Sequence, residues 1–225
     1  MCVSFGLVAV MELDPRNYDN IEIKDSDVRH IVLSHLVHNC FKETAESFIS
    51  STGMEHPANY PADMDKRKPI FQFALEGNAL KAIELTNQLA PNLLTENQDL
   101  HFDLLSLHFV ELVGSRKCTE ALEFAQTKLT PFGKVHKYVA KLEDFMALLA
   151  YEEPKNSPMF HLLSMEYRQH VADSLNRAIL AHANLPSYSA LEKLIQQTTA
   201  VRQCLHLELG KDGSSLFSLK AFLKS

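Results

Sequence analysis

The sequence is poor in residues that interrupt regular structure, with 7 glycines, 9 prolines and no tryptophan among 225 residues. This scarcity argues against a turn-rich β protein and against a largely disordered chain. Cysteine is also sparse, and its positions are far apart and form no Cys-x-x-Cys pair: Cys2, Cys40, Cys118 and Cys204. The spacing excludes a disulfide framework and a RING-type zinc module, and it predicts free thiols in a reducing compartment.

Basic clusters and long apolar runs are limited too. The net charge is −6 and no block of five basic residues occurs, so we expect no nucleic-acid partner. The triplet at 66–68, Lys-Arg-Lys, is interpreted as a solvated helix turn. The apolar stretch 1–10 is too short to span a bilayer and lacks a basic flank. We therefore expect no membrane partner, and we interpret 1–24 as a flexible N-terminal extension.

Helical periodicity is what the chain has in abundance, since 46% of its residues are hydrophobic and recur at helical spacing. Near the N-terminus the apolar positions are Ile31, Val32, Leu36, Phe41, Ala45, Phe48 and Ile49. The last four fall at i, i+4, i+7 and i+8, on one face of a helix. Asn39 and Cys40 interrupt the pattern, and Gly53 is a typical helix stop. Residues 27–53 are therefore predicted to form a helical hairpin.

Two proline-containing stretches divide the rest of the chain. Residues 54–62 have the composition of a linker, and 152–158 form a second break. Elsewhere the apolar pattern is helical, and two segments with the order helix, glycine turn and alanine-rich helix are typical of stacked αα-hairpins. We predict an all-α fold, in which the first helical hairpin is followed by stacked antiparallel helical hairpins.

The hairpin also permits a chemical interpretation. His35 and His38 are three residues apart and share a helix face, as zinc ligands do, with Cys40 or Glu43 as further ligands. However, Cys40 lies at the helix break and the spacing is not repeated elsewhere. We expect exposed, interfacial or border histidines and no metal, and a helical metal-binding protein or enzyme stays as an alternative.

Other candidate chemistry is weaker. Asp99, His101 and Asp103 form an acid–base cluster in sequence, but both aspartates share one helix face, which we interpret as solvated. No Gly-x-Ser-x-Gly, His-Glu-x-x-His or Gly-x-Gly-x-x-Gly pattern occurs. We therefore expect no catalytic residue, no cofactor and no enzyme activity.

The order of the segments resembles a known family. Residues 28–53 resemble a LisH motif, a short helix, a turn and a second helix, with matching residues Leu36, Phe41, Glu43, Thr44, Ala45 and Phe48. Residues 65–113 resemble a CTLH domain, and 120–132 with 142–158 resemble a CRA domain. LisH, CTLH and CRA in this order are similar to the small scaffold subunit of the glucose-induced-degradation (CTLH) ubiquitin-ligase complex.

The resemblance implies a division of the chain into LisH at 25–56, CTLH at 63–120, CRA at 117–215 with a crossover near 152–158, and a C-terminal segment at 216–225. Its CRA tail is expected to pack back onto the LisH part, and CTLH with the first half of CRA is expected to form a second assembly surface. Family members usually have glycine at the hairpin break, where this chain has Cys40. We expect Asn39 to adopt the left-handed backbone conformation there instead.

The implied function is a non-catalytic scaffold of a multi-subunit E3 ubiquitin ligase in nucleus and cytoplasm. It would link RING-bearing subunits to a substrate receptor, with other LisH/CTLH/CRA proteins as partners. A hairpin of about 27 residues cannot bury its apolar stripe alone, so it must pack on another chain or on a distant part of this one. We predict a homo- or hetero-dimer through Ile31, Val32, Leu36, Phe41, Ala45, Phe48 and Ile49. A generic α-solenoid adaptor unrelated to ubiquitin is the alternative.

Overall fold

The computed structural model describes residues 22–55 and 60–209, so most of the predicted extension 1–24 and all of the segment 216–225 lie outside the described residues. The α-helices are α1 (Asp25–His38), α2 (Lys42–Thr52), α3 (Tyr60–Leu75), α4 (Ala79–Leu89), α5 (Leu93–Glu96), α6 (Gln98–Gly114), α7 (Cys118–Phe124), α8 (His136–Ala147), α9 (Met165–His182) and α10 (Ala190–Leu209). Shorter turns are the π-helical η2 (Ala125–Leu129) and the 3₁₀ segments η3 (Thr130–Lys134), η4 (Leu148–Ala150), η5 (Pro154–Asn156) and η6 (Phe160–Leu163).

The all-α prediction is confirmed, because the described residues contain helices and turns and no strand. The predicted break at 152–158 contains the 3₁₀ turn η5, and the predicted stop Gly53 ends α2 with φ of 68°. Among the described helices, none has both the length and the apolar composition that crossing a bilayer requires.

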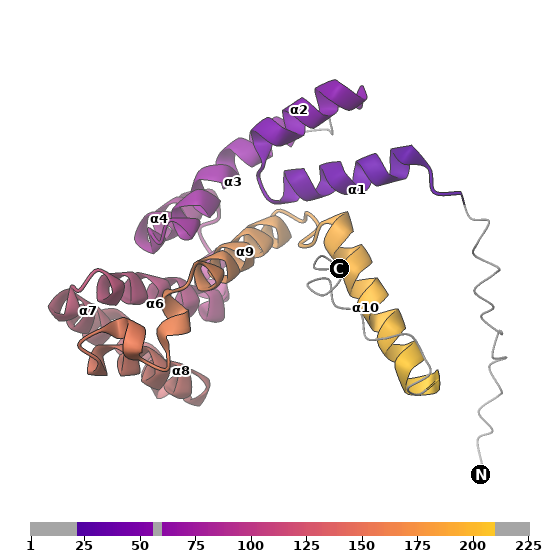
Figure 1. Cartoon of the computed structure of the whole chain (residues 1–225). Helices are drawn as coiled ribbons and strands as arrows, with labels where there is room; N and C mark the ends of the chain where they lie inside the picture. The colour runs from indigo at the N-terminus through magenta and orange to yellow at the C-terminus, as the bar shows by residue number, and fades with distance from the viewer. Residues whose placement is uncertain (1–21, 56–59, 210–225) are drawn as a thin grey trace, which may run out of the picture.

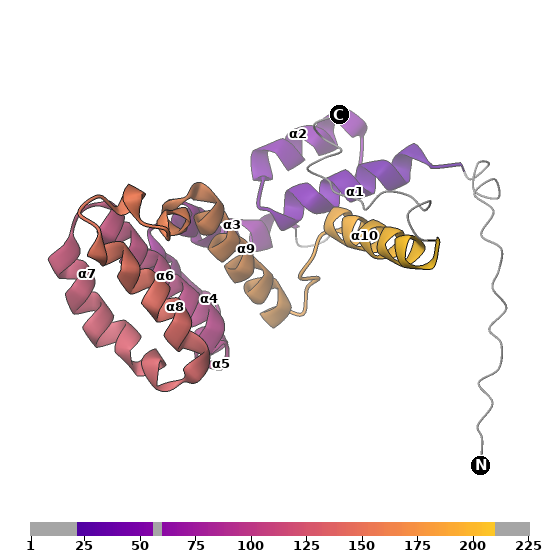
Figure 2. The same cartoon turned by 60° about the horizontal axis from the view of Figure 1, so that its bottom comes forward.

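Helix α6 lies at the centre of the main body because it is apolar around most of its circumference. Leu100, Leu104 and Leu107 on one side join a core with residues of α3, α4, α5 and α9. Phe102 and Phe109 on the other side join a second core with residues of α7, η2 and α8. Figure 2 shows α4, α6, α7 and α8 gathered in this body. The two cores therefore share one buried helix.

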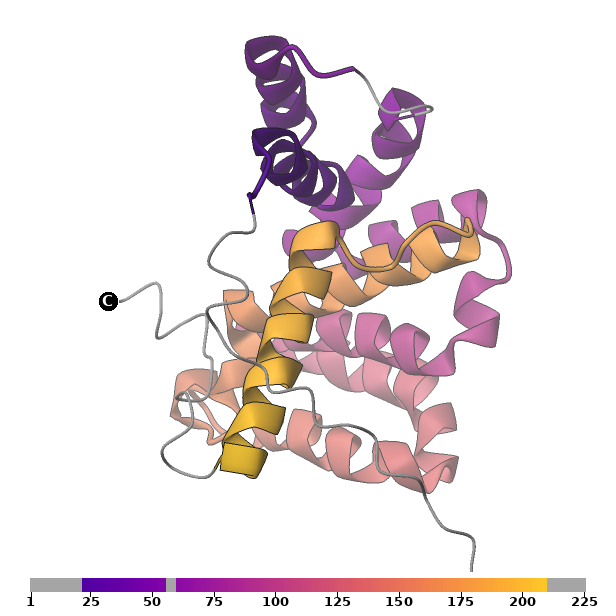
Figure 3. The same cartoon turned by 90° about the vertical axis from the view of Figure 1, so that its right-hand side faces the viewer.

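Helix α9 packs along α3 although the two are about a hundred residues apart in sequence, and it extends from the body towards α10 (Figure 1). Helices α1 and α2 stand at one end of the molecule, with the start of α10 beneath them (Figure 3). Their small core contains Leu33, Ala45 and Ile49 with Met64 of α3. Helix α10 contacts α1, as the resemblance implied for the CRA tail. The hairpin thus packs on distant parts of its own chain.

Candidate protein-interaction site

The turn between α1 and α2 is set by one residue with a left-handed backbone. Cys40 has φ of 59°, whereas Asn39 has φ of −89°, so the expectation that Asn39 would take the left-handed position is wrong. The Phe41 N–H donates to the Leu36 carbonyl at 2.9 Å and the Cys40 N–H to the Val37 carbonyl at 3.2 Å. This Schellman-type closure needs its left-handed residue one position after the helix cap, which is Cys40.

The side chain of Arg67, from α3, is hydrogen-bonded to this turn. This side chain is only 2% exposed and is among the largest fully buried side chains of the described residues. Nη2 donates to the Val37 carbonyl at 3.3 Å, and Nη1 donates to the His38 carbonyl and to Cys40 Sγ, both at 3.2 Å. These carbonyls belong to the end of α1, where backbone oxygens lack helical partners and the helix dipole is negative. A buried guanidinium at this position therefore satisfies the helix end.

The same guanidinium connects the hairpin to the body. Arg67 Nε donates to Asp63 Oδ2 at 2.8 Å, and Nη1 donates to Asn176 Oδ1 of α9 at 2.6 Å. Asn176 in turn donates through Nδ2 to the His38 carbonyl at 2.8 Å. The buried charge is thus both paired and hydrogen-bonded, as a buried charge must be. We call Asp63, Arg67 and Asn176 with the end of α1 the Arg67 network. The interpretation of 66–68 as a solvated turn is wrong for Arg67.

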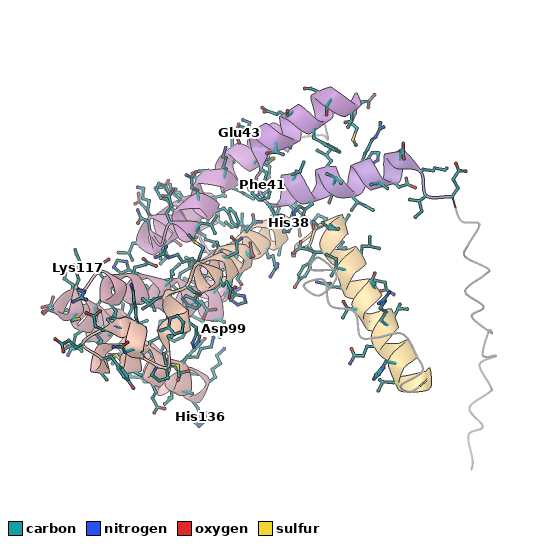
Figure 4. All side chains as sticks on the ribbon, in the orientation of Figure 1. His38, Phe41, Glu43, Asp99, Lys117 and His136 are labelled. Atoms are coloured by element: carbon teal, nitrogen blue, oxygen red, sulfur yellow. The ribbon has the colours of Figure 1, made fainter. Side chains whose placement is uncertain are left out.

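A second set of contacts joins α1 to the start of α10. The buried His38 donates from Nε2 to the Ser187 carbonyl at 3.0 Å, and its Nδ1 lies 3.7 Å from Glu192 Oε2. The Ala190 N–H donates to Ser34 Oγ at 3.1 Å. We call these contacts the α10 junction. Figure 4 places His38 on the side of α1 that faces α9 and α10. The expectation that His38 is an exposed or border residue is therefore wrong.

The protonation states of Cys40 and Glu192 fit a structural role for the Arg67 network and the α10 junction. Burial raises the pKa of the Cys40 thiol despite the nearby Arg67 charge, so the thiol stays neutral and accepts a hydrogen bond. Burial also acts to raise the pKa of Glu192, but hydrogen bonds from Ser189 and Arg177 outweigh it and the net pKa is lowered. Glu192 is therefore held as a carboxylate at the start of α10.

The predicted interface residues divide by exposure. Ala45 and Ile49 are buried within the hairpin core, and Ile31, Leu36 and Phe48 are half-buried. Val32 and Phe41 are exposed, at 36% and 48%. The dimer through these residues stays a prediction, and within the set Val32 and Phe41 are the most accessible to a partner.

Sequence reasoning missed further exposed apolar side chains on α1 and α10. Val28 of α1 is 47% exposed and lies one helical turn before Val32, while Leu194 and Val201 of α10 are 51% and 45% exposed. The i, i+4 spacing of Val28 and Val32 was a signal for one shared face. Large apolar side chains that cluster on a surface are typical of protein-interaction sites.

The other polar candidates have structural partners. Asp99 accepts from the Tyr138 hydroxyl at 2.7 Å and pairs with Lys137 at 2.6 Å. Asp103 is half-buried, and this burial raises its carboxyl pKa although Lys141 lies 3.3 Å away. The solvated face predicted for both aspartates is thus correct for Asp99 alone. Within 22–55 and 60–209, no three or more His, Cys, Asp or Glu residues are grouped to hold a metal ion.

Comparison with known proteins identifies the family of this chain. A model described as CTLH/CRA C-terminal to LisH motif domain matches residues 63–206. A glucose-induced degradation protein 8 homolog of Nematostella vectensis is 35% identical over 71% of this chain and 71% of its own length. A protein GID8 homolog of Arabidopsis thaliana is 31% identical over 78% and 73%, respectively. A Dictyostelium discoideum homolog of glucose-induced degradation protein 8 is 31% identical over 83% and 84%.

The matched region begins in α3, close to Arg67, and ends in α10, so it contains the parts of the Arg67 network outside α1. The chain therefore belongs to the CTLH/CRA family, in the group that includes the glucose-induced degradation protein 8 homologs.

Proposed function

We propose that this chain is a non-catalytic subunit of a glucose-induced-degradation (CTLH) E3 ubiquitin-ligase complex. The observation that carries the proposal is the similarity to several glucose-induced degradation protein 8 homologs over most of both chains. A further relative, 29% identical over 78% of this chain, is named GID complex subunit 8 of Schizosaccharomyces pombe. An assembly role is in keeping with a helical chain whose buried polar groups support one another.

The finer role that we propose is a scaffold that links RING-bearing subunits to a substrate receptor. The Arg67 network and the α10 junction hold the hairpin in a fixed orientation on the body. A hairpin that is already held in one orientation loses less conformational entropy when a partner binds it. Val28, Val32 and Phe41 remain exposed on the hairpin and supply apolar surface for a partner. Other LisH/CTLH/CRA proteins are the partners proposed for this surface.

Affinity purification of the tagged full chain, followed by mass spectrometry, tests the proposal. We expect RING-bearing subunits and a substrate receptor to be recovered with the wild-type chain. Val28→Asp with Val32→Asp places two charges on the exposed face of α1 and is expected to remove them from the purified material. Met146→Asp on α8 is a matched control, since Met146 is 38% exposed and lies outside the hairpin. Parallel fractionation tests the proposed location in nucleus and cytoplasm.

Two outcomes would contradict the proposal. Absence of every RING-bearing subunit from the wild-type sample would overturn membership of a ubiquitin ligase. Full recovery of these subunits with the double aspartate variant would keep membership but overturn the role of the hairpin. Circular dichroism of each variant shows whether the helical fold is intact, so that a folding defect is not mistaken for a binding defect.

A further inference from the structure

A groove of about 770 Å³ lies in the main body, and none of its lining residues comes from α1, α2 or α10. Its walls come from α4 and α6 on one side and from η2, η3 and the start of α8 on the other. Ile83, Phe124, Phe132 and Tyr138 make its lining mainly apolar. The volume falls within the range of ligand pockets in proteins, about 300–1,000 Å³.

The edges of the groove carry apolar side chains that the chain itself leaves uncovered. Leu80 of α4 is 43% exposed, and Val135 before α8 is 46% exposed. Thr127 and Lys128 on the wall belong to the π-helical turn η2, and such turns occur frequently at functional sites. Exposed apolar edges and an irregular helical wall both indicate a surface shaped for a partner.

The charge of the lining is opposite in sign to that of the whole chain. The chain carries a net charge of −6, yet the charged residues of the groove are Lys128 and Lys137, with no carboxylate among the lining residues. Lys137 pairs with Asp99, whereas Lys128 is exposed and forms no ion pair with another described residue. The pKa of His101, which also lines the groove, is lowered by burial and further by the Lys128 charge. The lining therefore favours an acidic ligand.

We propose that this groove binds an amphipathic helix of a partner subunit, with apolar side chains in the groove and acidic side chains beside Lys128. A helix is favoured over an extended peptide because the groove has helical walls and offers no sheet edge to which a strand could add. Apolar anchors at i, i+3 or i+4 and i+7 match such a groove. The inference rests on the proposed function, since it assigns one surface of the same complex subunit.

Selection from a phage-displayed random peptide library on the purified full chain tests the groove directly. Peptides of about 16 residues are long enough for four helical turns. We expect enrichment of peptides with apolar residues at helical spacing and with Asp or Glu on one flank. Lys128→Glu is expected to weaken their binding about tenfold, and Val135→Asp to abolish it. Lys134→Glu makes the same charge change outside the groove and is expected to leave binding within about twofold.

Several results would overturn the inference. Failure to enrich any peptide that depends on Val135, or enrichment of basic or extended peptides, would show that the groove is not an acidic-helix site. Equal effects of Lys128→Glu and Lys134→Glu would show a general charge effect. Thermal melts of the variants separate loss of fold from loss of binding, and Val135→Ala serves where Val135→Asp does not fold. Because the selection uses the isolated chain, its failure is distinct from failure to recover RING-bearing subunits.

Discussion

Replacing Arg67 by methionine is expected to loosen the hairpin from the body. Methionine keeps an unbranched apolar side chain in the buried site but removes every donor of the guanidinium. The Val37 carbonyl still accepts from the Cys40 N–H, and the His38 carbonyl still accepts from Asn176 Nδ2. Cys40 Sγ, a weak acceptor, and the part-exposed Asp63 carboxylate each lose one contact. The buried acceptor that loses most is Asn176 Oδ1, which now accepts from Arg67 at 2.6 Å. The loss is therefore concentrated on one buried acceptor.

The magnitude follows from these partners. An orphaned buried acceptor costs about 1–3 kcal/mol. Asp63 is 34% exposed, so solvent replaces much of its ion pair and the loss there is under about 1 kcal/mol. We therefore expect Arg67→Met to lower the free energy of unfolding by about 1–4 kcal/mol. Arg67→Met with Asn176→Leu removes the orphaned acceptor, so the double variant should lose about 1 kcal/mol less than the sum of the single losses.

Urea unfolding of the full chain, followed by circular dichroism at the helical band, measures these differences. Lys66→Met is the matched control, because Lys66 is the exposed neighbour of Arg67 and its replacement should cost less than about 0.5 kcal/mol. An Arg67→Met variant as stable as Lys66→Met would refute the network. Strict additivity of the Arg67 and Asn176 changes would show that the two side chains do not act together.

Three further substitutions test other parts of the fold by the same unfolding measurement. Cys40→Gly should exceed Cys40→Ala in stability by about 1 kcal/mol, since both remove Sγ but only glycine has no Cβ in the left-handed turn; equal stability would contradict the strained turn. Gly77→Ala should cost about 1–3 kcal/mol, because Gly77 has φ of 80° and its added Cβ would lie 2.5 Å from Glu111 Cδ, which Arg168 holds; a neutral effect would contradict this close packing. The folded-state pKa of Glu192 is lowered, so folded Glu192 binds fewer protons and its contribution is present above the ordinary glutamate pKa of about 4.3. The advantage of wild type over Glu192→Gln should therefore shrink as the pH falls below that value, and an advantage that grows with acidity would contradict the assignment.

The periodicity of the sequence predicted those features of the fold that depend on neighbouring residues. The helical class, the break after α1, the stop at Gly53 and the apolar face of α2 all follow from residues close together in the chain. The same rules located two exposed interface candidates, Val32 and Phe41. These features depend on spacing and on backbone preferences, which a single sequence displays directly.

The buried polar contacts were beyond the sequence because their partners are distant. Arg67 and Asn176 are 109 residues apart, and His38 and Ser187 are 149 apart. Arginine and histidine in a polar stretch have the same pattern whether a distant helix covers them or not. The left-handed residue was misplaced by one position because its location depends on which carbonyl closes the helix end, and only the Leu36 and Val37 contacts identify Cys40.

The proposed function depends on association through the exposed apolar face of α1, and the mass of the purified assembly measures that association. Tagged full chain is purified from cells, the tag is removed, and the eluted species is weighed by size-exclusion chromatography with light scattering. We expect a wild-type mass well above one chain of 25.4 kDa, and a single-chain mass for Val28→Asp with Val32→Asp. A wild-type species of one chain, or an unchanged larger mass in the folded double variant, would contradict this expectation.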